Sequence, residues 1–346
     1  MRVDRRYVAV AAILGIFLLV QLGALALVEP FNSAGFQDVE NPSDPTNSLL
    51  YVGAILVATV VMLGAFRYGG DRVIRAVLVV SSGYLSFYVF AVLLPAAPLP
   101  GLAAFTPAVA LAGLVTVALW VHPEWYVIDA AGVVMGAGAA GLFGINFGVL
   151  PALVLLVVLA VYDAISVYGT EHMLTLAEGV MDLKVPVVLV VPLSLSYSFL
   201  DEAPPAESGE DDTGTDEGAD PADEDDAAMA DGGGDEATTP APDDERDAFF
   251  IGLGDAVMPA VLVASAGFFA PVGVSSLVPG IALTLPALTA IVGTNLGLLV
   301  LMYFVMQGRA HAGLPLLNGG AIGGYLVGAL AAGIPLVQAL GLAPYL

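Results

Sequence analysis

The chain has 346 residues, of which 58% are hydrophobic and only 12% are charged, and its mean hydropathy is +0.89. Soluble globular domains carry roughly 45–50% apolar and about 25% charged residues, so this composition excludes an ordinary soluble protein. The chain has no cysteine and three histidines. These counts exclude a disulfide framework and cysteine-ligated metal centres, and we expect neither a metal site nor another cofactor.

The net charge of −24 is concentrated in one segment, because 20 of the 33 acidic residues lie between Asp201 and Asp247. The only lysine is Lys184. Abundant Asp and Ala with so little Lys resembles the composition of haloarchaeal proteins. We therefore expect an apolar body in a lipid bilayer with one acidic, solvated segment, and no nucleic-acid partner. No pattern indicates an oligomeric state.

Apolar segments recur along the rest of the chain, and most of them have the roughly 20 residues that a helix needs to cross a bilayer. The sequence predicts an all-α polytopic membrane protein with nine transmembrane helices, at about 7–28, 48–66, 73–94, 101–121, 126–144, 148–168, 248–270, 278–306 and 314–338.

The first apolar segment has an alternative interpretation as a signal peptide. Arg2, Arg5 and Arg6 precede it, and it ends in Ala24-Leu25-Ala26. Its apolar run of about 22 residues is longer than the roughly 7–15 residues of a signal peptide, which favours a retained helix.

The basic residues predict the orientation of the helices. With the N-terminus inside, eight of the nine Lys and Arg residues fall in inner segments and Arg75 lies one turn into the third helix, as the positive-inside rule requires. We therefore expect a multi-pass protein of the cell membrane with the N-terminus in the cytoplasm. The predicted parts are a six-helix part at 1–168, a cytoplasmic loop at 169–247 and a three-helix part at 248–346.

The predicted cytoplasmic loop has two sections. An apolar run from Val185 to Leu195 is short and is interrupted by Pro186 and Pro192, so we expect it to be interfacial or re-entrant. Residues 200–247 are acidic and rich in Gly, Ala, Pro and Thr. Such a segment cannot bury enough apolar surface to fold, so we expect disorder.

Three acidic residues lie within apolar segments, where a charge is costly and usually functional. Asp129 follows Trp125-Tyr126 near the inner end of the fifth segment, and we interpret it as interfacial. Asp163 and Asp255 lie about 7 Å and about 10 Å from the inner ends of the sixth and seventh segments, at 1.5 Å per residue. Because these two helices run in opposite directions, their carboxylates can meet at a similar depth.

Two adjacent carboxylates in a medium of low dielectric cannot both ionise easily, so the pair is expected to share one proton. The ionised member can accept a proton from an attacking water, and the protonated member can donate to the carbonyl oxygen of a peptide bond. This chemistry needs no metal. The alternative is that the acids only pair with polar groups that lock two helices together.

The motifs around the two aspartates resemble those of the presenilin and signal peptide peptidase family of intramembrane aspartyl proteases. They are Tyr162-Asp163 and Gly252-Leu253-Gly254-Asp255, on successive helices separated by a long loop. The resemblance implies catalytic roles for Asp163 and Asp255, with Tyr162, Gly252, Leu253 and Gly254 supporting the site. It implies transmembrane proteins or peptides as substrates.

The third motif of that family is Pro-Ala-Leu at the start of the last helix. A literal Pro286-Ala287-Leu288 lies within the eighth segment, and we interpret it as a chance match. Ala312-Gly313-Leu314, followed by Pro315, opens the ninth segment, where the family has its motif. The resemblance implies that 312–315 support the site by offering backbone groups to an extended substrate.

Other functions fit the sequence less well. A proton- or ion-coupled transporter also uses intramembrane aspartates and interrupted helices, but no inverted repeat is evident. No His-Glu-x-x-His zinc motif occurs, and Gly273-Val274-Ser275-Ser276 lacks the second glycine of an intramembrane serine-protease motif.

Overall fold

The computed structural model describes residues 5–68, 70–97, 101–169, 188–194, 197–198, 248–307 and 312–345. Within them, each of the nine predicted apolar segments contains an α-helix. The helices are α1 (Arg5–Ser33), α2 (Thr46–Arg67), α3 (Asp71–Leu93), α4 (Thr106–Val121), α5 (Trp125–Asn146), α6 (Val149–Gly169), α8 (Leu253–Phe268), α9 (Leu285–Val305) and α10 (Gly313–Ala331). Seven are long and apolar enough to cross a membrane, whereas α4 and α8 have 16 residues each. The expectation of a helical, multi-pass membrane protein is confirmed.

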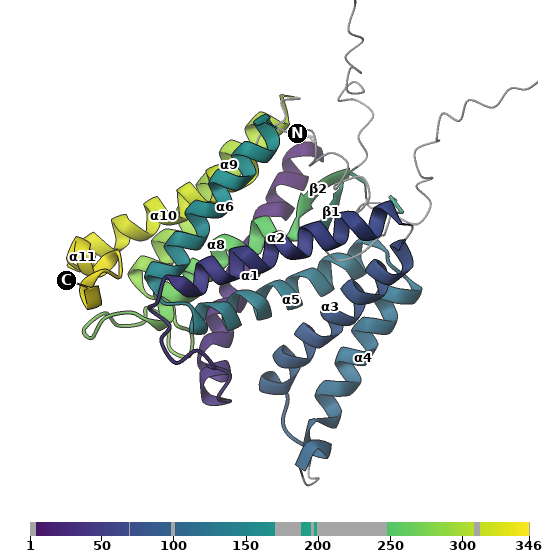
Figure 1. The fold of residues 1–346 in the computed structure, drawn as a ribbon, viewed down its shortest axis with the longest axis horizontal. Coiled ribbons are helices and arrows are strands. Elements are labelled where there is room, and N and C mark those ends of the chain that lie inside the picture. Colours follow the sequence, from purple (N-terminus) through teal and green to yellow (C-terminus); the bar gives the residue numbers. More distant parts are fainter. Residues whose placement is uncertain are drawn as a thin grey trace, which may run out of the picture.

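Helix α8 lies inside the bundle and contacts α1, α5, α6, α9 and α10 (Figure 1). Helices α6, α9 and α10 lie on one side, and the α3–α4 pair projects from the opposite side. Helix α1 crosses the middle of the molecule, and Phe17, Val20 and Ala24 on it are fully buried. Helix α1 is therefore part of the core of the described structure.

Glycines bring α9 and α10 into backbone contact. Gly293 and Gly297 on α9 face Gly320 and Leu316 on α10, so closely that a methyl group on any of the three glycines would overlap a backbone carbonyl of the other helix. This is the close approach that small residues at four-residue spacing permit in membranes. Packing of α10 on α9 and α6 fixes the position of the first turn of α10.

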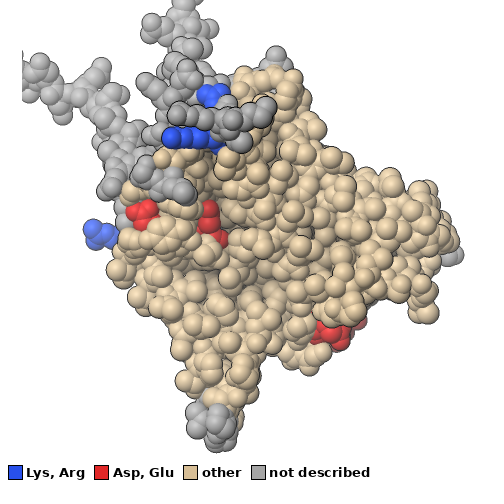
Figure 2. Space-filling view, turned by 180° about the vertical axis from the view of Figure 1, so that it is seen from behind, with Lys and Arg blue, Asp and Glu red and all other residues tan. Residues whose placement is uncertain are grey.

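The surface of the bundle is nearly uncharged. Figure 2 shows Lys and Arg only at one end of the visible face, with a few acids elsewhere on an otherwise uncharged surface. Large apolar side chains are exposed, including Leu50 (74%) and Val60 (70%) on α2. A soluble monomer rarely exposes apolar surface on this scale, so these side chains are suited to lipid.

The seventh predicted segment, 248–270, is helical only in part. Its first five residues form strand β2 (Ala248–Gly252), which pairs antiparallel with β1 (Val188–Pro192) in the register Val188↔Gly252 to Pro192↔Ala248. The prediction of a helix from 248 is wrong because Phe249, Phe250 and Ile251 are aromatic or β-branched and meet a complementary run of Val and Leu. The described part of the predicted interfacial run at 185–195 is thus a strand with a buried centre.

The last two predicted segments are also shorter than expected. Helix α9 begins at Leu285 rather than 278, because Gly280 has a φ of 80° and Thr284 caps the helix through the amide of Ala287. Helix α10 ends at Ala331, before Gly333 with a φ of 77°, and a short helix α11 (Leu336–Ala339) follows. Gly and a capping Thr terminate helices at these positions whatever the hydropathy of the flanking residues.

Several expectations concern residues outside the described part of the chain. They include the disorder of 200–247 and the positions of Lys184, Arg246 and Arg309. The orientation of the helices and the division into three parts stay predictions.

Candidate active site

Asp163 lies on α6, six residues before the helix ends at Gly169. Its side chain is only 5% exposed, and its Oδ2 accepts a hydrogen bond of 3.0 Å from the backbone N–H of Leu314. The amide of Gly313 is directed at the same carboxylate. The first turn of α10 therefore binds the side chain of Asp163.

The start of α10 can make these contacts because the first amides of a helix have no partner within the helix. Ala312 is the N-cap, with an extended backbone (φ −64°, ψ 122°), and its own N–H lies 3.4 Å from the hydroxyl of Tyr168 at the end of α6. Pro315 lacks an amide hydrogen at a position in the first turn where none is needed. Residues 312–314 thus join α10 to the last two turns of α6.

Asp255 lies in the first turn of α8, so the prediction that about 10 Å of helix precedes it is wrong. Its carboxylate is partly exposed and is close enough to Asp163 for electrostatic repulsion between them. A side chain at Gly313 would place its Cβ 3.4 Å from Oδ2 of Asp255. Since Leu314 contacts the other carboxylate, both aspartates converge on consecutive residues of α10.

The glycines of the Gly252-Leu253-Gly254-Asp255 motif have different surroundings. Gly252 is the N-cap of α8, and a Cβ there would lie 3.6 Å from Oδ2 of Asp255. Among the described residues, a Cβ at Gly254 would meet no atom within 4 Å. Gly254 is exposed, so a side chain there would point into open space, whereas Leu253 is buried, at 6% exposure.

Tyr162 does not lie in the buried part of the site. Its side chain is 43% exposed, because the residue before Asp163 faces away from the interior of the bundle. The structure brings Asp163, Asp255 and residues 312–314 together and leaves the Tyr162 ring at the periphery.

Pro286-Ala287-Leu288 is remote from the aspartates. It forms the beginning of α9, at the opposite end of that helix from the start of α10, and Pro286 packs against Gly328 near the end of α10. Ala287 is fully buried. The literal triplet therefore has a packing position, and the geometry favours 312–314 as the segment beside the site.

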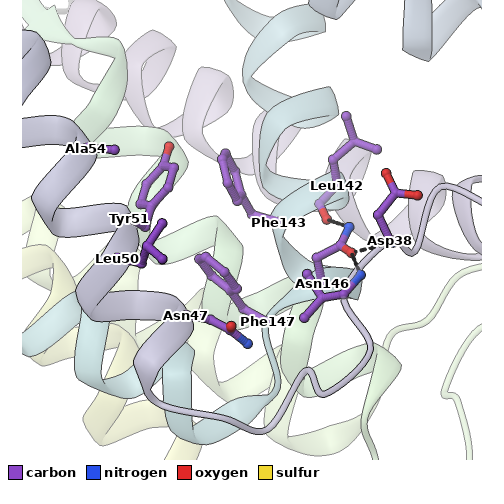
Figure 3. Close-up of a pocket in the computed structure, with 10 residues that line it drawn as sticks. Asp38, Asn47, Leu50, Tyr51, Ala54, Leu142, Phe143, Asn146 and Phe147 are labelled. Atoms are coloured by element: carbon purple, nitrogen blue, oxygen red, sulfur yellow. Dashed lines mark hydrogen bonds between the residues drawn. The ribbon is translucent and has the colours of Figure 1, made fainter.

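The structure contains a pocket of about 370 Å³ whose lining includes neither Asp163 nor Asp255 (Figure 3). Tyr51 of α2 and Phe143 and Phe147 of the α5 end lie on one side of it, and Asn146 binds the backbone of Asp38 and Val39 on the other. Asn146 lies 17 residues after Asp129, or roughly 25 Å along α5, so the pocket and Asp129 are near opposite ends of this helix. The described residues include no group of three or more His, Cys, Asp or Glu side chains that could hold a metal ion.

Two residues near the site were not predicted. Tyr168 contacts the Ala312 amide, and the side-chain amide of Asn318, fully buried on α10, donates a 2.9 Å hydrogen bond to the Leu156 carbonyl on α6. Asn318 lies four residues after Leu314, on the same face of α10. An uncharged amide inside an apolar helix is a recognisable sequence signal, although its partner is not.

Comparison with known proteins gives a consistent result. A family model described as signal-peptide peptidase, presenilin aspartyl protease matches residues 14–334. Two crystal forms of a presenilin family intramembrane aspartate protease are similar to the chain, each at 35% identity. The C222 form has a TM-score of 0.61 and covers 93% of this chain and 99% of its own, and the P2 form has a TM-score of 0.59 and covers 92% and 97%. Comparison with curated protein sequences finds no match.

Proposed function

The chain belongs to the signal-peptide peptidase and presenilin family of aspartyl proteases, and on that premise we propose that it hydrolyses peptide bonds within transmembrane segments through Asp163 and Asp255. The observation that carries the proposal is the convergence of both carboxylates on Gly313 and Leu314. Both carboxylates face the same turn of α10, where an acid and a base can act on one peptide bond.

The two carboxylates supply an acid and a base without a covalent intermediate. The ionised carboxylate accepts a proton from water as the water oxygen attacks the scissile carbonyl, and the protonated one donates its proton to the developing oxyanion. The tetrahedral intermediate then expels the amine, which takes the proton that the base removed from water. As the carbon–nitrogen bond breaks, the other carboxylate takes back a proton from a hydroxyl of the intermediate. The products are a carboxylic acid and an amine, and the pair again holds one proton.

The first turn of α10 supports this chemistry in two ways. Its N–H groups bind the side chain of Asp163 and so fix one carboxylate. The glycine at 313 keeps the neighbouring volume free beside Asp255. We assign 312–315 the supporting role that the family places at the start of its last helix.

We propose further that nine helices cross the cell membrane, with the N-terminus and the 169–247 loop in the cytoplasm. The restriction of Lys and Arg to the predicted inner segments and their edge supports this orientation. The comparisons give no support to the transporter interpretation.

The proposal is tested with purified protein and a reporter transmembrane peptide. Asp163→Ala and Asp255→Ala are each expected to abolish cleavage, because each removes half of a shared acid–base pair. Glu40→Ala, at an exposed loop acid, is the matched control and is expected to cleave like the wild type. Thermal unfolding in detergent checks that the variants are folded, and substantial proteolysis by either aspartate variant would overturn the proposal.

A further inference from the structure

Asp129 is the third acid within the apolar segments, and the mechanism above does not use it. It lies one turn into α5, and its Oδ1 accepts a 2.8 Å hydrogen bond from the backbone N–H of Val190, 61 residues away in the chain. Val190 is the central residue of β1 and is 1% exposed. The carboxylate therefore binds the outer edge of the strand pair rather than lying free at a membrane surface.

Two leucine side chains from other elements, Leu189 of β1 and Leu253 of α8, pack against the same face of α5. Gly132 and Gly136 follow Asp129 at helical spacing. A methyl group at Gly132 would lie 3.0 Å from Cδ2 of Leu189, and one at Gly136 would lie 3.2 Å from Cδ1 of Leu253. The two glycines thus leave room for a strand residue and for the leucine of the Gly252-Leu253-Gly254-Asp255 motif.

The α5 face is connected to Asp255 by a short, continuous path. Val190 lies opposite Phe250, and Val188 lies opposite Gly252. Strand β2 continues directly into α8, whose N-cap is Gly252 and whose first turn carries Asp255. A displacement of β1 from α5 would therefore be passed through strand pairing to the catalytic carboxylate.

A second carboxylate holds the same chain segment. Glu124, at the beginning of α5 and 8% exposed, accepts a 2.7 Å hydrogen bond from the hydroxyl of Ser198. Glu124 and Asp129 thus accept hydrogen bonds from two donors, Val190 and Ser198, that lie eight residues apart in the chain. The first turns of α5 therefore bind the chain at Val190 and at Ser198.

We propose that Asp129 is a positioning residue, which fixes β1 on α5 and, through β2, sets the place of Asp255 relative to Asp163. This inference rests on the proposed proteolytic function. The role requires a hydrogen-bond acceptor at position 129 and no proton transfer, which separates it from a role as a third catalytic acid.

The decisive comparison is Asp129→Ala against Asp129→Asn, because asparagine keeps the acceptor oxygen. Asp129→Ala is expected to lower kcat about 10- to 100-fold with KM changed less than about threefold, since a displacement of about 1 Å at a reacting group costs on the order of 100-fold. Asp129→Asn is expected to stay within about threefold of the wild type and to keep its pH profile.

A structural measurement accompanies the kinetics. Hydrogen–deuterium exchange of peptides covering 188–192 and 248–252 is expected to accelerate in Asp129→Ala and to be unchanged in Asp129→Asn. Should Asp129→Ala fail to fold, Gly132→Val displaces the strand from its second contact, and the same kinetic and exchange changes are expected.

Three results would overturn the inference. They are wild-type kinetics in Asp129→Ala, an Asp129→Asn variant as inactive as Asp129→Ala, and an inactive Asp129→Ala with unchanged exchange in both strands. A wild-type protein that cleaves no transmembrane peptide would count against the proposed function, whereas the exchange experiment would still test how β1 is held.

Discussion

A substitution at Gly313 tests the geometry of the site most directly. A Cβ at this position lies 3.4 Å from Oδ2 of Asp255 and 3.4 Å from Cδ2 of Leu301, which is ordinary van der Waals contact on two sides. Gly313→Ala is therefore expected to retain cleavage within about fivefold. Gly313→Val adds two methyl groups about 1.5 Å beyond Cβ, so the carboxylate or Leu301 must move by roughly 1 Å. We expect a loss on the order of 100-fold in kcat.

Gly319→Val is the matched control for this experiment. Gly319 lies on the same helix, and a Cβ there meets no described atom within 4 Å. Gly319→Val therefore makes the same Gly-to-Val change in α10 as Gly313→Val but adds no contact with a neighbouring side chain. Cleavage of a transmembrane reporter peptide is measured for all three variants beside their thermal unfolding. Wild-type activity in Gly313→Val, or equal losses in Gly313→Val and Gly319→Val, would refute the reasoning. Ala287 is unsuitable as a control because it is fully buried between helices.

The remaining predictions concern the pH dependence, packing, loop and orientation. Cleavage is expected to follow a bell-shaped pH profile, because the pair works with one shared proton, and a rate that rises steadily to high pH would contradict this. Gly320→Val should destabilise the α9–α10 contact by about 1–3 kcal/mol in detergent unfolding, whereas Gly323→Val, whose Cβ meets no described atom within 4 Å, should not. Deletion of residues 203–244 should leave cleavage of the reporter largely intact, because that segment is too polar for a membrane-buried site. Of two matched single-span reporters, the one with its N-terminus outside should be cleaved faster, and the opposite ranking would reverse the predicted orientation.

The helices could be predicted from the sequence because the bilayer imposes a length on each apolar segment. Their boundaries could not, since hydropathy does not distinguish a helix from a buried strand. Phe249, Phe250 and Ile251 are as apolar as the helix that follows. Their partner strand begins at Val188, which lies opposite Gly252 and 64 residues before it in the chain. The strand pair, and with it the place of Asp255 in the first turn of α8, therefore required the structure.

The approach of the two acids followed from their positions on antiparallel segments, but their supports did not. Tyr168 and Asn318 contact α10 and α6 through the rotation of each helix about its axis. Rotation depends on packing, here on the glycines of α9 and α10, and an apolar segment on its own does not specify it. The sequence alone suggests an interfacial position for Asp129. Its hydrogen bond to Val190 depends on a strand that hydropathy does not reveal.

The shortness of α8 bears on the supply of water. Sixteen residues extend about 24 Å, against roughly 30 Å for the hydrocarbon core, so α8 alone does not fill the bilayer depth. Strand β2 precedes α8 directly, and any of its backbone groups that lie at the depth of the hydrocarbon must be covered by protein or face an aqueous cavity. A hydrolase that cuts inside a membrane needs the same cavity for its second reactant. Helix α8 begins only two residues before Asp255, so this partly exposed carboxylate lies at the junction of helix and strand, where a helix wall does not separate it from water on every side.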